Sequence, residues 1–89
     1  MSEEKNITQK LTNTNVNLYP NPVHSTLKIE STDEIFTEII IFSLEGGMIQ
    51  KLHPTEDSLQ IDTSQLAPGV YFAKITSPEF TTTQKFIKK

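Results

Sequence analysis

Apolar and polar side chains alternate along the chain in short runs, and this spacing is typical of β-strands rather than helices. The pattern is clearest from Thr26 to Glu30, where Leu27 and Ile29 share one face and Lys28 lies on the other. We predict strands at residues 16–19, 26–30, 36–44, 48–53, 59–61, 69–76 and 81–89. Short strands separated by turns, with no helical stripe of useful length, predict an all-β fold. We therefore expect an immunoglobulin-like β-sandwich of about seven short antiparallel strands.

Two of these segments have informative apolar faces. The third is apolar on both faces from Ile39 to Phe42, which predicts a central strand covered on both sides. The sixth places Tyr71, Ala73 and Ile75 together on one face, opposite Val70, Phe72 and Lys74.

Glycine and proline mark the turns between the strands. Gly46 is expected in a β-hairpin turn with Glu45 and Gly47, because glycine adopts positive φ at no steric cost. Pro68 and Gly69 occupy the middle of a four-residue turn and are the preferred pair for type II. The residues before them should form an extended or 3₁₀ link, since this pair stops a helix early.

The stretch Tyr19-Pro20-Asn21-Pro22 restricts the backbone at every position. Proline fixes φ and donates no backbone hydrogen bond, and the residue before each proline is pushed towards extended geometry. We therefore predict a stiff, extended segment at the edge of a sheet or at the entry to one, where missing donors are tolerated, and not in a central strand.

Length and composition bound the possibilities further. The chain has 89 residues, enough for one domain, and its formal net charge is −3. It contains no cysteine, which excludes disulfides and thiolate metal sites, and no arginine, which together with the acidic balance argues against nucleic-acid binding. No apolar run approaches the ~20 residues of a membrane span. Residues 1–15 are polar, unlike a signal peptide, and are expected to form a linker or disordered lead-in before a domain at residues 16–89.

Groups that could perform catalysis are sparse. His24 adjoins Ser25, but neighbouring positions on a strand point to opposite faces, and His53 is expected at a solvated turn. The acidic side chains fall into two groups without the spacing of a calcium loop, namely Glu30, Asp33, Glu34 and Glu38, then Glu56, Asp57 and Asp62. We expect solvated acidic loops, no catalytic residue, no metal and no cofactor.

The last segment ends in Lys85-Phe86-Ile87-Lys88-Lys89. Lysines on an outer strand protect its edge from pairing with other chains. The same lysines could also form an exposed C-terminal handle for a partner, and the sequence leaves both interpretations open.

Three longer stretches taken together resemble one family. They are LYPNPVHSTLKIES near the start, IIIFSLEGGMIQKL in the middle and IDTSQLAPGVYFAKI with TTTQKFIKK at the end. This order and spacing, from about Val16 to Lys89, is similar to the type A C-terminal sorting domain of the type IX secretion system. The landmarks would be Pro20, Asn21, Pro22, Gly46, Leu66, Pro68, Gly69, Tyr71, Lys85, Lys88 and Lys89. The chain departs from the family pattern at Gly47 and in a longer loop around residues 53–58.

The resemblance implies a non-catalytic secretion signal in a Gram-negative bacterium. It implies a covalently attached N-terminal cargo domain that passes through the periplasm and the outer-membrane translocon. It also implies a sortase-like protease that removes the domain, before about Val16, and cargo that stays on the cell surface or is released. Two other classes remain open, an adhesion or carbohydrate-binding module and a small hydrolase. Whether the Tyr-Pro-Asn-Pro stretch is a structural corner or a recognised feature is also left open.

Overall fold

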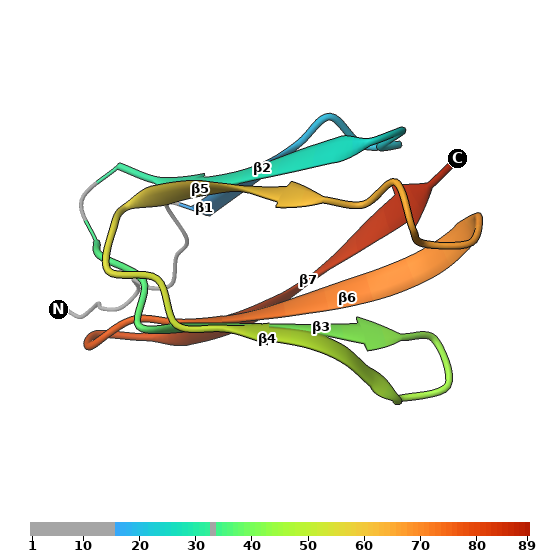
Figure 1. Ribbon diagram of the computed structural model, residues 1–89. Helices are drawn as coiled ribbons and strands as arrows, with labels where there is room; N and C mark the ends of the chain where they lie inside the picture. Colours follow the sequence, from blue (N-terminus) through green and yellow to red (C-terminus); the bar gives the residue numbers. More distant parts are fainter. Residues whose placement is uncertain (1–15, 33) are drawn as a thin grey trace, which may run out of the picture.

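The computed structural model describes residues 16–32 and 34–89, which form seven antiparallel strands in two facing sheets with no helix among them (Figure 1). The strands are β1 (Val16–Tyr19), β2 (Thr26–Ser31), β3 (Glu38–Ser43), β4 (Met48–Leu52), β5 (Ser58–Asp62), β6 (Gly69–Thr76) and β7 (Thr81–Lys88). One sheet has the order β1-β2-β5 and the other β4-β3-β6-β7. This arrangement matches an immunoglobulin-like sandwich and confirms the predicted fold class.

The core lies between the two sheets, which Figure 1 shows as an upper and a lower layer. It consists of inward side chains at alternate positions, as the period of a strand requires. The buried apolar residues are Val16, Val23, Leu27, Ile29, Phe36, Ile39, Ile41, Ile61, Tyr71, Ala73, Ile75 and Phe86. Tyr71, Ala73 and Ile75, which the sequence places on one face of a strand, all lie in this core. Truncating one of the large members to alanine would cost about 2–5 kcal/mol.

The prediction that β3 is covered on both faces is wrong. Ile39 and Ile41 are at most 2% exposed and face the other sheet. Ile40 and Phe42 point the other way and are only half-buried, because side chains of the neighbouring strands cover them and no further described layer lies outside. The apolar residues on both faces of β3 therefore form one buried face and one solvent-facing surface that is unusually apolar.

Because successive strands run in opposite directions, the connections between them lie alternately at the two ends of the sandwich. Residues 20–25, 44–47 and 63–68 lie at the end where β7 finishes, on the right of Figure 1. We call these residues, with Lys88 and Lys89, the motif end. Residues 34–37, 53–57 and 77–80 lie at the opposite end, where β1 begins. We call that the lead-in end.

Candidate recognition site

Most of the residues singled out from the sequence lie at the motif end. Pro20, Asn21 and Pro22 connect β1 to β2, and Gly46 lies in the hairpin between β3 and β4. Leu66 and Pro68 precede β6, which Gly69 begins, and β7 brings Lys88 and Lys89 to the same end. Lys85 is the exception, because it lies midway along β7 and is exposed on the outside of its sheet.

Asn21 joins the first landmark to the last strand. Its Oδ1 atom accepts a hydrogen bond of 3.0 Å from the backbone amide of Ile87. Next to it the Val23 amide donates to the Ile87 carbonyl at 2.7 Å, and the Lys89 amide donates to the Val23 carbonyl at 2.9 Å. The prolines on either side of Asn21 donate no such bonds, so the asparagine side chain and Val23 provide the pairing along this edge of β7.

The predicted extended geometry of this stretch is wrong, although its place beside a sheet edge is right. β1 is an edge strand of the three-stranded sheet, and it ends at Tyr19. Residues 20–22 then bend, and the peptide bonds Tyr19–Pro20 and Asn21–Pro22 are cis. The chain has to reverse here because Tyr19 pairs with Lys28 in the antiparallel ladder of β1 and β2.

Lys88 is buried, with 8% of its surface exposed, so it is no part of an exposed handle. It shares the inward face of β7 with Phe86, two residues before it. Its Nζ atom donates a hydrogen bond of 3.0 Å to the carbonyl of Leu66. A buried ammonium needs such a partner, since leaving it unpaired would be costly. Lys88 therefore ties the end of β7 to the link between β5 and β6.

At the end of β5, next to that link, lies a charged group held by local hydrogen bonds. The Ser64 side chain and backbone amide bond to the carboxylate of Asp62, with the amide 2.9 Å from Oδ1. These bonds, together with a smaller attraction from Lys88, lower the pKa of Asp62 below its usual value. The Leu66 amide closes the turn by donating to the Thr63 carbonyl at 3.0 Å. This agrees with the predicted link without an α-helix.

Tyr71 fixes the same link from the inside. Its hydroxyl donates a hydrogen bond of 2.6 Å to the carbonyl of Ala67, and its ring stacks on Phe86 with the centroids 5.6 Å apart. A tyrosine near the start of this strand that bonds back to the preceding connection is the tyrosine corner of immunoglobulin-like sandwiches. Tyr71 is 8% exposed, so its role here is to position its neighbours.

The two landmark glycines differ in what they do. Gly46 has φ of +94° in the turn between β3 and β4, which confirms the predicted hairpin glycine. Gly69 has φ of +155° and is the first residue of β6. The middle of a type II turn needs about +80° at that position. The predicted type II turn is therefore wrong, and Gly69 instead leads the chain into an extended strand.

Among the described residues, polar contacts join three of the four landmark segments. Asn21 bonds to β7, Lys88 bonds to Leu66, and Tyr71 holds the segment that includes Leu66. The hairpin of Gly46 bonds only within itself, from the Gly46 amide to the Ser43 carbonyl at 2.9 Å. The exposed landmark residues of the joined surface are Pro20, Asn21, Pro22, Pro68 and Lys89.

The final strand behaves as predicted in one respect. β7 is an edge strand of the four-stranded sheet, and Lys85 is exposed along it. Near its end, however, Val23 and Asn21 cover the edge by pairing with Ile87 and its neighbours. Edge protection therefore comes from the bend between β1 and β2 as well as from lysine.

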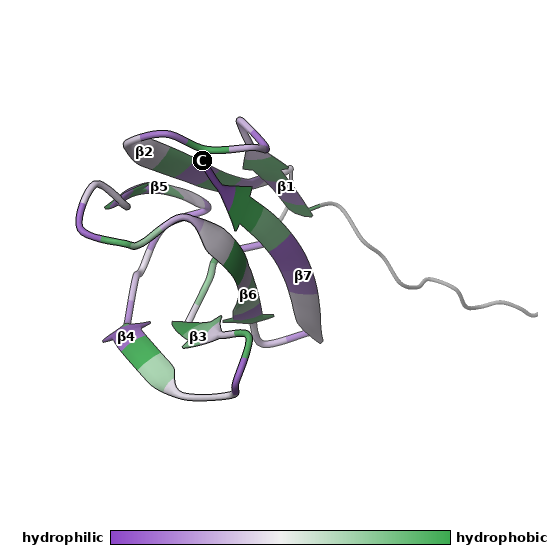
Figure 2. Ribbon diagram, turned by 90° about the vertical axis from the view of Figure 1, so that its right-hand side faces the viewer, coloured by the Kyte–Doolittle hydropathy of each residue, from purple (hydrophilic) through white to green (hydrophobic). Residues whose placement is uncertain are grey.

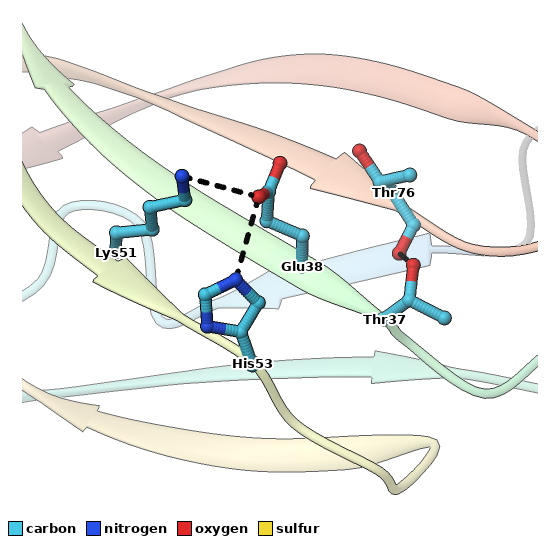
Figure 3. A network of polar contacts seen from close by, with 5 residues as sticks. All are labelled: Thr37, Glu38, Lys51, His53 and Thr76. Atoms are coloured by element: carbon cyan, nitrogen blue, oxygen red, sulfur yellow. Dashed lines mark hydrogen bonds and ion pairs between the residues drawn. The ribbon is translucent and has the colours of Figure 1, made fainter.

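The two histidines, His24 and His53, are both exposed and lie at opposite ends of the sandwich. His53 is 67% exposed, with its Nε2 atom 3.5 Å from Oε2 of Glu38, and Lys51 Nζ lies 3.6 Å from the same oxygen (Figure 3). Nearby, the Thr37 hydroxyl donates to the Thr76 carbonyl at 3.2 Å. These side chains form a surface cluster at the lead-in end of β3, β4 and β6, and His24 is exposed at the other end of the sandwich.

Within residues 16–32 and 34–89, no group of three or more His, Asp or Glu side chains is arranged to hold a metal ion. Asp33, which the sequence placed in the first acidic group, lies outside the described residues, as does the predicted lead-in at 1–15. In the same described part of the chain, no helix has the length and apolar character needed to cross a membrane.

Sequence reasoning missed two residues of the site. Val23 is fully buried and pairs its backbone with β7, and Phe86 is fully buried beneath Tyr71. The signal for Phe86 was available, because Phe86 and Lys88 are two apart in a strand and share a face. Nothing local marks Val23 as a partner of residues more than sixty positions away.

Comparison with known proteins gives a consistent result. A family model described as "Secretion system C-terminal sorting domain" matches residues 17–89. One similar solved chain comes from PorZ of Porphyromonas gingivalis, described as an essential bacterial surface component of the type-IX secretion system. It has a TM-score of 0.70 at 16% identity, over 83% of this chain and 11% of that chain, so the likeness shows the fold alone. No curated protein sequence matches the chain.

Proposed function

Because this chain belongs to the family of type IX secretion C-terminal sorting domains, we propose that residues 16–89 direct an attached N-terminal cargo through the outer-membrane translocon of that system. The observation that supports this most strongly is the family match over the whole described sandwich. In this proposal the export signal is the surface of the folded domain, and no reactive side chain takes part in its recognition.

The motif end is the part of the domain that the machinery recognises. Its exposed landmark residues, from Pro20 to Pro22 with Pro68 and Lys89, are held in place by buried groups beneath them. Tyr71 and Lys88 supply two of the contacts that fix their positions. In this proposal the Tyr-Pro-Asn-Pro stretch is both a structural corner and a recognised feature.

The remaining steps of the proposal are those that the resemblance to the family implies. The cargo crosses the inner membrane with a separate signal and passes through the periplasm before it reaches the translocon. A sortase-like protease then cuts in the polar lead-in before about Val16, and the cargo stays on the cell surface or is released. Nothing in this sequence of steps asks the domain to be an enzyme or to bind a cofactor.

The test is an export experiment with the full chain fused behind an inert reporter that carries an N-terminal signal. In a cell with a type IX system the reporter should reach the surface or medium, and in a matched strain without the translocon it should stay in the periplasm. Retention of a folded fusion in the competent strain would contradict the proposal. Mass spectrometry of the released reporter would locate the cut.

Deleting residues 85–89 should abolish export, but this deletion also removes Phe86 from the core. A sharper comparison uses Lys89→Gln and Asn21→Ala, both at exposed positions, with circular dichroism to show that the fold is intact. If the folded variants and the deletion are all exported normally, the motif end is only structural.

The structure gives less support to a carbohydrate-binding role. Such a module needs an exposed aromatic platform for stacking, and Tyr19, 41% exposed, is the one exposed aromatic side chain in the described part of the chain. Its hydroxyl is already bonded to Glu30 Oε1 at 2.9 Å. Saturable binding on a glycan array would favour this alternative.

A further inference from the structure

The outer face of the four-stranded sheet carries a row of apolar side chains that crosses three strands. Met48 on β4 pairs with Phe42 on β3, and Phe42 pairs with Phe72 on β6. Residues paired in this way point to the same side of a sheet, and Phe42 alternates with the inward Ile41. Met48 is 61% exposed, while the two phenylalanines are half-buried. Figure 2 shows hydrophobic segments on the neighbouring strands β3 and β4.

Three lysines surround this row on the same face. Lys85 on β7 pairs with Phe72, while Lys51 and Lys74 both pair with Ile40 from its two sides. We call the six side chains Phe42, Met48, Lys51, Phe72, Lys74 and Lys85 the outer patch. Its centre is apolar and its border is positively charged.

The positive charge of the outer patch is unusual for this chain, whose net charge is −3. Among the described residues, Glu38 is the one carboxylate that the strand register places on this face. Its Oε2 atom lies 3.6 Å from Lys51 Nζ, in an ion pair. No ion pair involves Lys74 or Lys85 among the residues that the structure describes. Two ammonium groups beside an exposed apolar row are therefore available to a partner.

We propose that the outer patch is a second docking surface of the domain, and that it binds an acidic protein surface of the export machinery with apolar side chains at its centre. This inference rests on the proposed function, since it assigns a second contact to the same export step. Apolar centres with charged borders are the usual anatomy of protein interfaces, and complementary charge speeds encounter and selects partners.

Charge argues against a second copy of the chain as the occupant. A symmetric dimer through this face would set Lys74 and Lys85 near their own counterparts, and like charges across an interface are unfavourable. The shape argues against a lipid surface, because Phe42 and Phe72 are half-buried between their neighbours instead of projecting from the sheet.

The experiment uses the same reporter fusion and compares two changes in the patch with two matched changes elsewhere. The patch variants are Lys74→Glu with Lys85→Glu, and Met48→Glu. The controls are Lys28→Glu, on the outside of the other sheet, and Ile35→Glu, an apolar residue 54% exposed at the lead-in end. Circular dichroism melting of each purified fusion shows which variants are folded.

We expect each folded patch variant to reduce the exported fraction by about tenfold or more, because it sets negative charge against an acidic partner. The controls should stay within about twofold of wild type. Normal export of the folded patch variants, with wild type exported, would overturn this inference and leave the proposed function standing. Failure of wild type itself would overturn the proposed function.

A vesicle experiment separates a protein partner from a membrane. The purified fusion is mixed with phosphatidylglycerol vesicles, and binding is measured by co-sedimentation. Absence of binding supports the protein partner. Binding that Lys74→Glu with Lys85→Glu removes would show a lipid-binding face instead and would overturn the proposal.

Discussion

Removing the Tyr71 hydroxyl tests how the tyrosine corner supports the motif end. Tyr71→Phe keeps the ring stacked on Phe86 and deletes only the bond of 2.6 Å to the Ala67 carbonyl. A protein hydrogen bond contributes about 0.5–1.5 kcal/mol net, and the short distance favours the upper half of that range. Ala67 is exposed, so water can reach its carbonyl and no large further penalty is expected. The variant should therefore be about 1 kcal/mol less stable.

Urea unfolding and thermal melting of the purified domain measure this loss. For a domain of this size, 1 kcal/mol lowers the melting temperature by about 4–8 °C. It should also lower the urea midpoint by about 0.3–1 M at slopes of about 1–3 kcal/mol/M. Tyr19→Phe is the matched control, because its hydroxyl bonds to Glu30 at the exposed surface and its loss should stay within about 0.5 kcal/mol. If Tyr71→Phe and Tyr19→Phe lowered the free energy of unfolding by equal and small amounts, the reasoning would be refuted.

Three further predictions concern single side chains. Gly46→Ala should destabilise the domain by about 1–2 kcal/mol because φ is +94°, whereas Gly47→Ala, at ordinary φ, should change the urea midpoint little. The lowered pKa of Asp62 stabilises the fold above the ordinary carboxyl pKa, near 3.8, and this contribution disappears as pH falls through the folded-state pKa. An Asp62→Asn variant should accordingly be less stable than wild type at pH 6 and equal to it in strong acid, as shown by melting across pH. Asn21→Ala should speed hydrogen exchange at the Ile87 amide, measured by NMR, and unchanged exchange there would show that the amide is protected without Asn21.

The sequence predicted the strands because the relevant information is local. Leu27 and Ile29 alternate with polar neighbours, and Gly46 marks a turn whose glycine the hairpin needs. Each predicted strand overlaps an observed one with ends within about two residues, the scatter expected for strand limits. The membership of the family was also visible, because its landmarks recur in order along the chain.

The errors concern contacts between distant parts of the chain. Ile40 and Phe42 give β3 the apolar pattern of a strand that is buried on both faces. Whether such a strand is buried on both faces or exposed on one depends on whether another layer packs outside it, which the pattern does not tell. Lys88 was expected on the surface because lysine is rarely buried, yet a carbonyl at Leu66 makes its burial possible. No periodicity predicts such a partner, since it depends on how the sheets close on each other.

A sandwich with an odd number of antiparallel strands has its first and last strand ends on opposite sides, and this affects any protein that is attached to it. The described residues make seven strands, so Val16 lies at one end of the sandwich while Asn21 and Lys89 lie at the other. Under the proposed function, an N-terminal cargo of any size would be attached at the end opposite to the motif end. The size of the cargo would then not decide whether the motif end is accessible to the export machinery.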